Sequence, residues 1–424
     1  MTGALRDQTV GALAVRTVGV PDPGVALVDL LPDPAGLVWS RRGEGLIGWG
    51  EAAVFRCSGA DRFAAAQDWW AGVSGRAAVR DDVARPGSGL VAFASFGFAS
   101  GSESVVVVPS VVVGHRGDDW WVTTVGVDGA LPPLPPDLVA APAPASPGDL
   151  TAADGALTGA AWSDAVAAAV ARIRAGELDK VVLARDVDVC TADPVDLRWP
   201  LRRLADRYDS CFTFAVDGLL GATPELLVRL DGRLATSRVL AGTIRRTGSR
   251  ARDEALAGSL ARSSKDLEEH EYAVASVASA LAPHCTGMNV PDAPFVLHLP
   301  NVMHLATDVT GVVSAAHGSS VLGLAAALHP SAAVCGTPRA VAEAAITELE
   351  HMDRGRYAGP VGWVSGSGDG EFGIALRSGQ QDPDDPRHVR IFAGCGVVAD
   401  SVPASELAES NAKLLPMLEA LASD

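Results

Sequence analysis

Residues 353–378 are DRGRYAGPVGWVSGSGDGEFGIALRS, and residues 390–398 are RIFAGCGVV. In both stretches, short runs of Val, Ile, Phe and Trp stand between glycine-rich turns, which is typical of β-strands. Patterns of helical periodicity flank this strand-rich block over Pro338–Glu350 and Pro403–Ala422. Further outward, strands and helices mix without a regular βαβ alternation. The sequence therefore predicts an α+β fold rather than a doubly wound parallel sheet.

The first third of the chain has mostly strand patterns. We expect one helix over Asp61–Gly72, and strands over Gly36–Arg56, Leu90–Phe96, Ser104–Val113 and Trp120–Val127. Seven prolines then fall within residues 130–148, which is typical of an exposed connector. We therefore predict an N-terminal lobe over residues 1–150, mostly strands and ending in this Pro/Ala-rich connector, followed by a catalytic region over residues 151–424.

The second region alternates less regularly between helices and strands. Ser163 is the predicted N-cap of its first helix, which runs to Gly176, and a helix is expected near Leu201. A hairpin is expected from Leu226 to Thr243, turning at Asp231-Gly232. The remaining predicted elements are strands over Lys180–Val189, Cys211–Val216, Val296–Leu299, Ala306–Val313, Pro360–Ser378 and Val389–Val398, and helices over Ser264–Leu281 and Ser319–Leu328.

The composition argues against several classes of partner. The 424 residues include 51 Asp and Glu against 34 Lys and Arg, which gives a net charge of −17. A nucleic-acid binder or a polybasic membrane-surface protein needs an excess of positive charge. The six cysteines form no C-x-x-C pair, and no apolar run is long enough to cross a membrane. We expect a cytoplasmic protein with reduced cysteines and neither nucleic-acid nor membrane partners.

Two ionisable residues interrupt apolar segments and are candidates for acid–base chemistry. Lys180 opens a strand of Val and Leu, where a lysine that loses its proton can act as a base. Glu225 stands between Pro224 and Leu226, and burial there would keep its carboxyl group protonated as an acid. A solvent-exposed Lys and a solvated strand-edge Glu are the structural alternatives.

Two predicted helices carry pairs of carboxylates on one face. Asp266 and Glu269 are three residues apart, as are Glu406 and Glu409, and Lys413 follows one turn later. Each pair alone is consistent with a solvated helix face. If the two faces converge, they form an oxygen-rich site suited to Mg²⁺.

Other polar residues follow apolar strands closely. Arg377 ends one of them and could bind a carboxylate through its two parallel N–H groups, or serve as a structural ion-pair partner. Gly242 precedes Thr243 and would allow the backbone to approach a ligand, although a plain turn is the alternative. His304 alone is more typical of a core histidine than of a catalytic group.

The order and wording of these motifs resemble the chorismate-utilising enzymes, which include isochorismate, salicylate, anthranilate and aminodeoxychorismate synthases. The resemblance covers about residues 160–420, through the segments DKVVLAR, TPELLV, LAGT, KDLEEH, HLAT, DRGRYAGPVGW, GDGEF, FAGCGVV and ELAES…K. The N-terminal RRGEGLIGWGEAA is also similar to isochorismate synthases. The implied fold has two facing, mainly antiparallel sheets flanked by helices, with the active site in the cleft.

The resemblance also implies roles, position by position. Lys180 matches the general base that activates water, and Glu225 matches the general acid that protonates the departing hydroxyl. Glu269 and Glu409 match the principal Mg²⁺ ligands, with Asp266 and Glu406 in supporting positions. The positions that match the substrate pocket are Gly242, Thr243, His304, Tyr357, Arg377, Gly394 and Lys413.

Within the family, the isochorismate synthase branch fits best. Aminodeoxychorismate synthases commonly carry a nucleophilic Lys at the position of Ala241. Anthranilate synthases have no Lys at the base position, which is Lys180 in this chain. Ala333, within HPSAAVCGTP, occupies a position where salicylate-forming lyases usually have Thr. The resemblance thus implies an isomerase that adds water to chorismate without loss of pyruvate, for menaquinone or siderophore and salicylate biosynthesis. The alternatives are a salicylate synthase and a non-catalytic chorismate-binding protein.

This branch needs no glutaminase subunit, and we expect a monomer. The chain departs from the family pattern at three places. Ser331-Ala332 replaces Thr-Pro, Cys335 replaces the first of two glycines, and Cys395 replaces the usual Ala between Gly394 and Gly396. Cys395 would lie near the implied metal, where it could weaken metal binding or confer sensitivity to thiol reagents, or be harmless.

Overall fold

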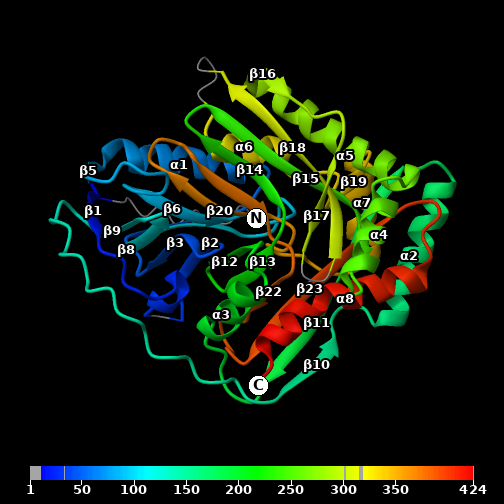
Figure 1. The fold of residues 1–424 in the computed structure, drawn as a ribbon, viewed down its shortest axis with the longest axis horizontal. Helices are drawn as coiled ribbons and strands as arrows, with labels where there is room; N and C mark the ends of the chain where they lie inside the picture. Colours follow the sequence, from blue (N-terminus) through cyan, green and yellow to red (C-terminus); the bar gives the residue numbers. More distant parts are fainter. Residues whose placement is uncertain (1–10, 33, 300–301, 315–318, 424) are drawn as a thin grey trace.

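The chain forms two large β-sheets that pack face to face, with helices around them (Figure 1). The computed structural model describes residues 11–32, 34–299, 302–314 and 319–423, except the side chains of Lys265, Asp266 and Glu269. Apolar side chains of the two sheets meet in a shared core, where Trp39 and Phe214 of one sheet pack with Phe93 and Trp363 of the other. The predicted α+β fold with facing sheets is confirmed.

The larger sheet contains strands from both ends of the chain. In spatial order its strands are β10 (Leu150–Asp154), β11 (Lys180–Thr191), β23 (His388–Val397), β22 (Ser378–Gln381), β13 (Leu219–Thr223), β12 (Phe212–Val216), β2 (Leu37–Arg41), β3 (Glu44–Trp49), β8 (Val111–Arg116), β9 (Asp119–Gly126), β1 (Ala14–Val20) and β5 (Ala78–Asp81), with β19 (Gly336–Thr337) paired to β11. Apart from the parallel pair of β1 and β5, the described neighbours run antiparallel.

The smaller sheet is likewise built from both parts of the chain. Its spatial order is β16 (Cys285–Asn289), β18 (Val302–Val313), β15 (Leu234–Arg245), β14 (Leu226–Asp231), β21 (Gly370–Ile374), β20 (Pro360–Ser365), β6 (Val91–Ser95), β7 (Ser104–Val108) and β4 (Ala53–Cys57), with β17 (Phe295–His298) paired to β18. Because β2 pairs with β12 and β6 pairs with β20, the N-terminal strands continue both sheets of the second region. The proline-rich connector runs along the outside of the molecule (Figure 1).

Helices from both regions cover the sheets. They are α1 (Arg62–Arg76), α2 (Gly159–Arg174), α3 (Arg198–Arg207), α4 (Arg250–Leu260), α5 (Ser264–Leu281), α6 (Val321–Leu328), α7 (Arg339–Glu350) and α8 (Pro403–Leu421). Helix α8 packs on β23 and α7 on β11, whereas α5 packs on β15 and β18 (Figure 1). None of the helices in the described ranges is both long and apolar enough to span a membrane.

Most predicted elements are present, with informative differences. The prediction of an N-cap at Ser163 is wrong: α2 begins at Gly159, and the Thr158 side chain accepts the capping hydrogen bond from the Ala161 amide. Ser163 is the fifth residue of α2, in its second turn, and donates to the Gly159 carbonyl instead. The single strand expected over Ser104–Val113 is two strands, β7 and β8, because Pro109 has no amide hydrogen to continue the ladder.

Candidate active site

One cavity gathers the predicted site residues whose side chains are described. It has a volume of about 310 Å³ and lies where β11, β23, β15 and the turn after β21 meet α8. The predicted residues that line it are Lys180, Glu225, Gly242, Thr243, His304, Tyr357, Arg377, Gly394, Glu406, Glu409 and Lys413. The side chains of Asp266 and Glu269 lie outside the described residues, although their helix α5 has the predicted bounds.

Glu225 is held in the short link between β13 and β14. Its carbonyl accepts a hydrogen bond from the Ile374 amide at 3.1 Å, which ties the link to β21. Only 8% of the residue is exposed. Burial raises the pKa of Glu225 to about 7, and the charges of Lys180, Lys413 and Arg377 oppose the rise. Near neutral pH this carboxyl group can therefore hold a proton and give it up.

Lys180 is the first residue of β11 and lines the same cavity as Glu225. Its backbone is in register with Thr337 of β19, and the neighbouring Asp179 amide donates to the Thr337 carbonyl at 2.8 Å. The side chain is half-buried, and its charge acts on the pKa of Glu225. The strand start thus presents an amine and the β13–β14 link presents a carboxyl group to one enclosed space.

A β-bulge shapes the wall formed by β15. Its pairing with β18 shifts between Ala241 and Thr243, and Gly242, with φ of +72°, is the extra residue. A positive φ favours glycine, which explains its presence in the LAGT motif. Thr243 Oγ1 lies 3.0 Å from His304 Nδ1 across the two strands. Burial, with the nearby charges of Arg377 and Lys413, lowers the pKa of His304 to about 3, so this ring stays neutral.

Arg377 lies in a backbone conformation that side chains rarely adopt. Its φ is +49°, in the left-handed region, at the turn between β21 and β22. Holding a non-glycine residue there costs on the order of 1–2 kcal/mol. The residue is 8% exposed, and no described residue accepts a hydrogen bond from its Nη1. A buried guanidinium donor that lines a cavity without an acceptor indicates an anionic ligand.

Helix α8 adds carboxylates and an ammonium group. Lys413 Nζ lies 2.7 Å from Glu409 Oε1 and donates to the Gly394 carbonyl at 3.0 Å. Burial acts to lower the pKa of Lys413, but Cys395 and Glu409 outweigh it and raise the pKa above the usual value. The Cys395 sulfur and carboxylate oxygens of Glu406 and Glu409 all lie within 4.8 Å of one another. Carboxylate oxygens are ligands that Mg²⁺ prefers, so Glu406 and Glu409 fit the metal that the family pattern implies.

Two groups on the cavity wall were not singled out by sequence. Phe392 stacks on Tyr357 with ring centroids 5.0 Å apart. Arg354 donates to Glu350 Oε2 at 2.9 Å, and also to the carbonyls of Val182 and Val334 at 2.8 and 2.9 Å. The sequence signal that could have identified Arg354 is its spacing: it stands four residues after Glu350 and three before Tyr357.

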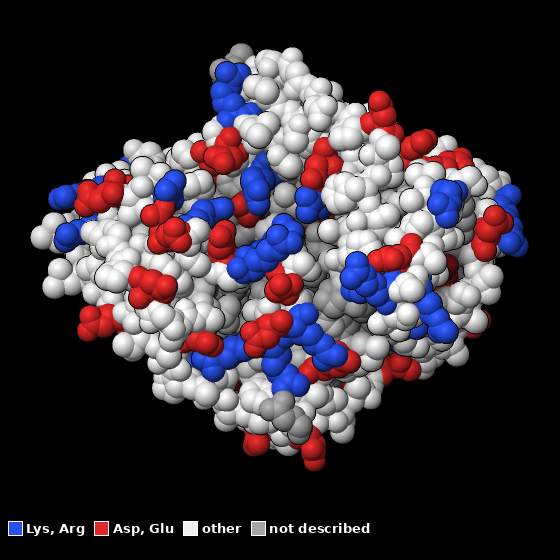
Figure 2. Space-filling view, viewed as in Figure 1, with Lys and Arg blue, Asp and Glu red and all other residues white. Residues whose placement is uncertain are grey.

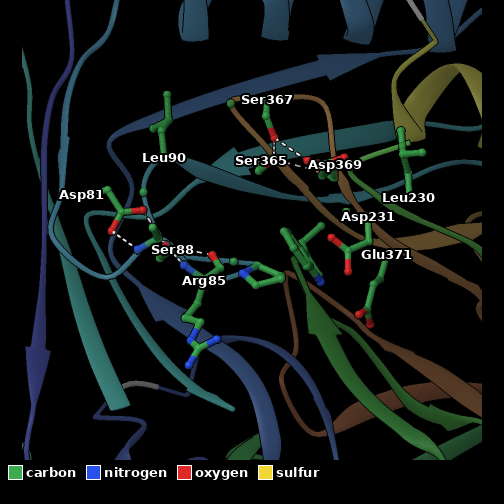
Figure 3. A pocket seen from close by; sticks show the side chains of 18 of the residues that line it. Asp81, Arg85, Ser88, Leu90, Leu230, Asp231, Ser365, Ser367, Asp369 and Glu371 are labelled. Carbon is green, nitrogen blue, oxygen red and sulfur yellow. Dashed lines mark hydrogen bonds between the residues drawn. The ribbon is translucent and has the colours of Figure 1, made fainter. Parts of the chain in front are cut away.

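A second cavity, of about 580 Å³, has a different chemical character (Figure 3). Its Asp81 accepts a hydrogen bond from Ser88 at 2.5 Å, and its Glu371 is bound by Arg229 at 2.9 Å and Arg116 at 3.2 Å. Burial would raise the pKa of Glu371, but the two arginines outweigh it and lower the pKa below its usual value. Glu371 is therefore an ionised carboxylate paired with two arginines, and not a proton donor like Glu225.

Surface charge does not single out another site on the face shown in Figure 2. Lysine and arginine side chains there are interspersed with aspartate and glutamate. The cavity that contains Lys180 and Glu225 is accordingly our candidate active site.

Comparisons with known proteins identify the family of the chain. The family described as "Chorismate binding enzyme" matches residues 140–422. Isochorismate synthase DhbC of Bacillus subtilis is 38% identical over 274 residues, which are 62% of this chain and 68% of DhbC. Isochorismate synthase MenF of the same organism is 35% identical over 267 residues, 62% of this chain and 56% of MenF.

Solved structures extend the similarity to nearly the whole chain. The crystal structure of DhbC from Bacillus anthracis superposes with a TM-score of 0.75 and 29% identity, and covers 92% of this chain and 97% of that one. The fold of MenF from Escherichia coli is also the same, with a TM-score of 0.79 over 98% of this chain and 97% of that chain, at 24% identity. The chain therefore belongs to the chorismate-binding enzymes, in the isochorismate synthase branch.

Proposed function

We propose that this chain is a Mg²⁺-dependent isochorismate synthase. It would convert chorismate to isochorismate by attack of water at C2 and departure of the C4 hydroxyl. The observation that carries the proposal is the cavity itself, which combines a half-buried lysine, a buried carboxyl group with a pKa of about 7, and an arginine whose Nη1 has no acceptor among the described residues. Similarity to DhbC and MenF of Bacillus subtilis supports the choice of reaction.

Glu225 suits the role of general acid. The C4 hydroxyl is a poor leaving group until it receives a proton. A carboxyl group with a pKa of about 7 still holds its proton over much of the physiological range, unlike an exposed Glu. Glu225 would donate that proton to the departing oxygen, and the carboxylate left behind would be stabilised by the charges of Lys180, Lys413 and Arg377.

Lys180 suits the role of general base. The attacking water must lose a proton as its oxygen bonds to C2, and a neutral amine can accept it. Lys413 is a poorer candidate, because its ammonium group is held by Glu409 and the Gly394 carbonyl. Acid–base catalysis on a small ring requires one group that accepts a proton and one that donates a proton. The amine and the carboxyl group that line this cavity meet that requirement.

The anionic groups of the substrate have matching partners. Arg377 would bind a carboxylate of chorismate through its buried guanidinium. Glu406 and Glu409 would hold Mg²⁺, with Asp266 and Glu269 of α5 proposed as the opposing ligands. When bound there, Mg²⁺ would orient the other carboxylate and offset its repulsion by the acidic side chains. His304 and Thr243 would shape the pocket as a neutral pair.

The product distinguishes this function from its alternatives. Purified protein should be incubated with chorismate and Mg²⁺, and the mixture separated by chromatography. Isochorismate without salicylate or pyruvate is the expected outcome. Salicylate together with pyruvate would identify a salicylate synthase, and unchanged chorismate would favour a non-catalytic binding protein.

A further inference from the structure

A thiol stands beside the carboxylates of the candidate metal site. Cys395 lies in β23 between two glycines, and 1% of the residue is exposed. Its Sγ is 3.3 Å from the Glu406 carbonyl and also hydrogen-bonds the Glu409 carboxylate. The sulfur and one carboxylate oxygen from each of Glu406 and Glu409 lie within 4.8 Å of one another. This distance allows one cation to contact all three groups.

The chemistry of these donors differs from an all-oxygen Mg²⁺ site. Carboxylates and water suit hard cations, whereas a thiolate selects softer ones such as Zn²⁺ or Co²⁺. A cysteine with two carboxylates gives three protein ligands, the number that zinc sites with an open position commonly use. The family pattern has Ala at position 395, so the sulfur is a departure of this chain.

The surroundings also indicate a ligand at this place. Arg377 is more than nine-tenths buried and lines the cavity that Glu406 and Glu409 also line, and its Nη1 has no acceptor among the described residues. An acceptor-free buried guanidinium indicates that this cavity holds a ligand. Lys413 weakens cation binding here, because its Nζ forms an ion pair with Glu409 Oε1 at 2.7 Å. Lys413 therefore competes with a cation for the Glu409 carboxylate, and the sulfur adds a donor that the described hydrogen bonds of Lys413 do not involve.

We propose that Cys395, Glu406 and Glu409 form a binding site for a thiophilic divalent cation of the Zn²⁺ class, in competition with Mg²⁺. On binding, the S–H bond breaks, its proton passes to solvent, and the thiolate forms a bond to the cation without any change of oxidation state. The site shares carboxylates with the proposed function, and its inhibitory consequence rests on that function. Cation binding itself needs neither chorismate nor turnover.

The test is a titration of metal-free protein with Co²⁺ in the absence of chorismate. A Co²⁺–thiolate bond gives a near-ultraviolet charge-transfer absorption that carboxylate ligands alone do not. The expected result is an absorption that saturates at about one Co²⁺ per chain and disappears when Zn²⁺ is added. Cys395→Ser, which keeps the side-chain size but removes the soft donor, should lack the absorption and bind Zn²⁺ at least about tenfold more weakly.

Two further variants keep the test decisive. Cys335→Ala is the matched control, because Cys335 is equally buried and burial likewise raises its pKa to about 12, yet it belongs to no described metal-ligating cluster. It should retain the full absorption.

Cys395→Ala, the residue of the family pattern, replaces Cys395→Ser if thermal melting shows that the serine variant does not fold. Absence of the absorption in the unaltered protein, or its persistence without Cys395, would overturn the proposal. Mg²⁺-dependent product formation is measured separately, so its failure would refute the proposed function and leave the absorption interpretable.

Discussion

Lys180 and Glu225 line one cavity, where burial raises the pKa of Glu225 to about 7 and the charge of Lys180 opposes that rise. In the proposed mechanism the two groups take part in different proton transfers. A carboxyl group that is still protonated can assist a leaving hydroxyl, and an amine on the same wall can accept a proton from water.

Replacing Glu225 tests the acid directly. Glu225→Gln keeps the shape of the side chain but has no proton to donate, so kcat should fall by about 10²–10⁴-fold. In the unaltered enzyme the protonated form is lost as pH rises through about 7, so kcat/KM should decline on the alkaline side of that value. That decline should be missing from the residual activity of Glu225→Gln. The exposed Glu103, paired with Arg56 at the surface, supplies the control Glu103→Gln, whose pH profile should be unchanged. A normal kcat for Glu225→Gln would remove Glu225 from the mechanism.

Replacing Arg377 tests anion binding. Its buried Nη1 lacks an acceptor among the described residues, and a substrate carboxylate would supply one. Arg377→Ala should chiefly raise KM, because it removes an interaction present in both the ground state and the transition state. Steady-state kinetics with chorismate measure the effect. A large loss of kcat at unchanged KM would show that Arg377 acts on the transition state instead of holding the substrate.

Removing the metal should abolish turnover. The carboxylates of Glu406 and Glu409 repel the anionic substrate unless a cation offsets their charge. Excess chelator should therefore stop isochorismate formation, and added Mg²⁺ should restore it. Glu409→Gln should be inactive while retaining its circular dichroism spectrum. Glu419→Gln, which alters a surface carboxylate on the same helix α8, should remain active. Full activity in chelator would exclude the metal assignment.

The buried pair of Arg354 and Glu350 should be important for stability. Their side chains are 2% and 1% exposed, and together they bind the backbone of β11 at Val182 and Ala184. Arg354→Met would leave the Glu350 carboxylate buried without its partner, which typically costs about 3–5 kcal/mol. Urea unfolding measures the change. The double variant Arg354→Met with Glu350→Gln should lose less than Arg354→Met alone, because no uncompensated charge remains. Equal losses would indicate that packing rather than charge sets the cost.

Local sequence patterns predicted the elements that have a strong apolar periodicity. Helix α5 has the expected bounds Ser264–Leu281, and β11 begins at Lys180 as expected. Helix α4 was not predicted, because within Arg250–Leu260 only Asp253 and Leu260 are buried and no apolar stripe is present. Strand β13 was also missed, because its apolar residues run directly into the TPELLV motif.

The candidate site was found through resemblance, since its parts come from distant strands. No local pattern predicts that β11 pairs with β23, which brings Ala184 opposite Gly394. Nor does spacing reveal that Arg354, just after α7, would donate to the Val182 carbonyl of β11. The left-handed backbone of Arg377 was equally unforeseen, because residues of that type rarely adopt a positive φ.

The origin of the new hydroxyl oxygen tests the central claim most directly. Chorismate should be incubated with the enzyme and Mg²⁺ in water labelled with heavy oxygen, and the isochorismate analysed by mass spectrometry. If Lys180 activates water for attack at C2, the product carries one solvent oxygen, and Lys180→Ala lowers the rate of its formation by about 10²–10⁴-fold. Isochorismate without labelled oxygen, or formed at an undiminished rate by Lys180→Ala, would contradict the mechanism proposed for this site.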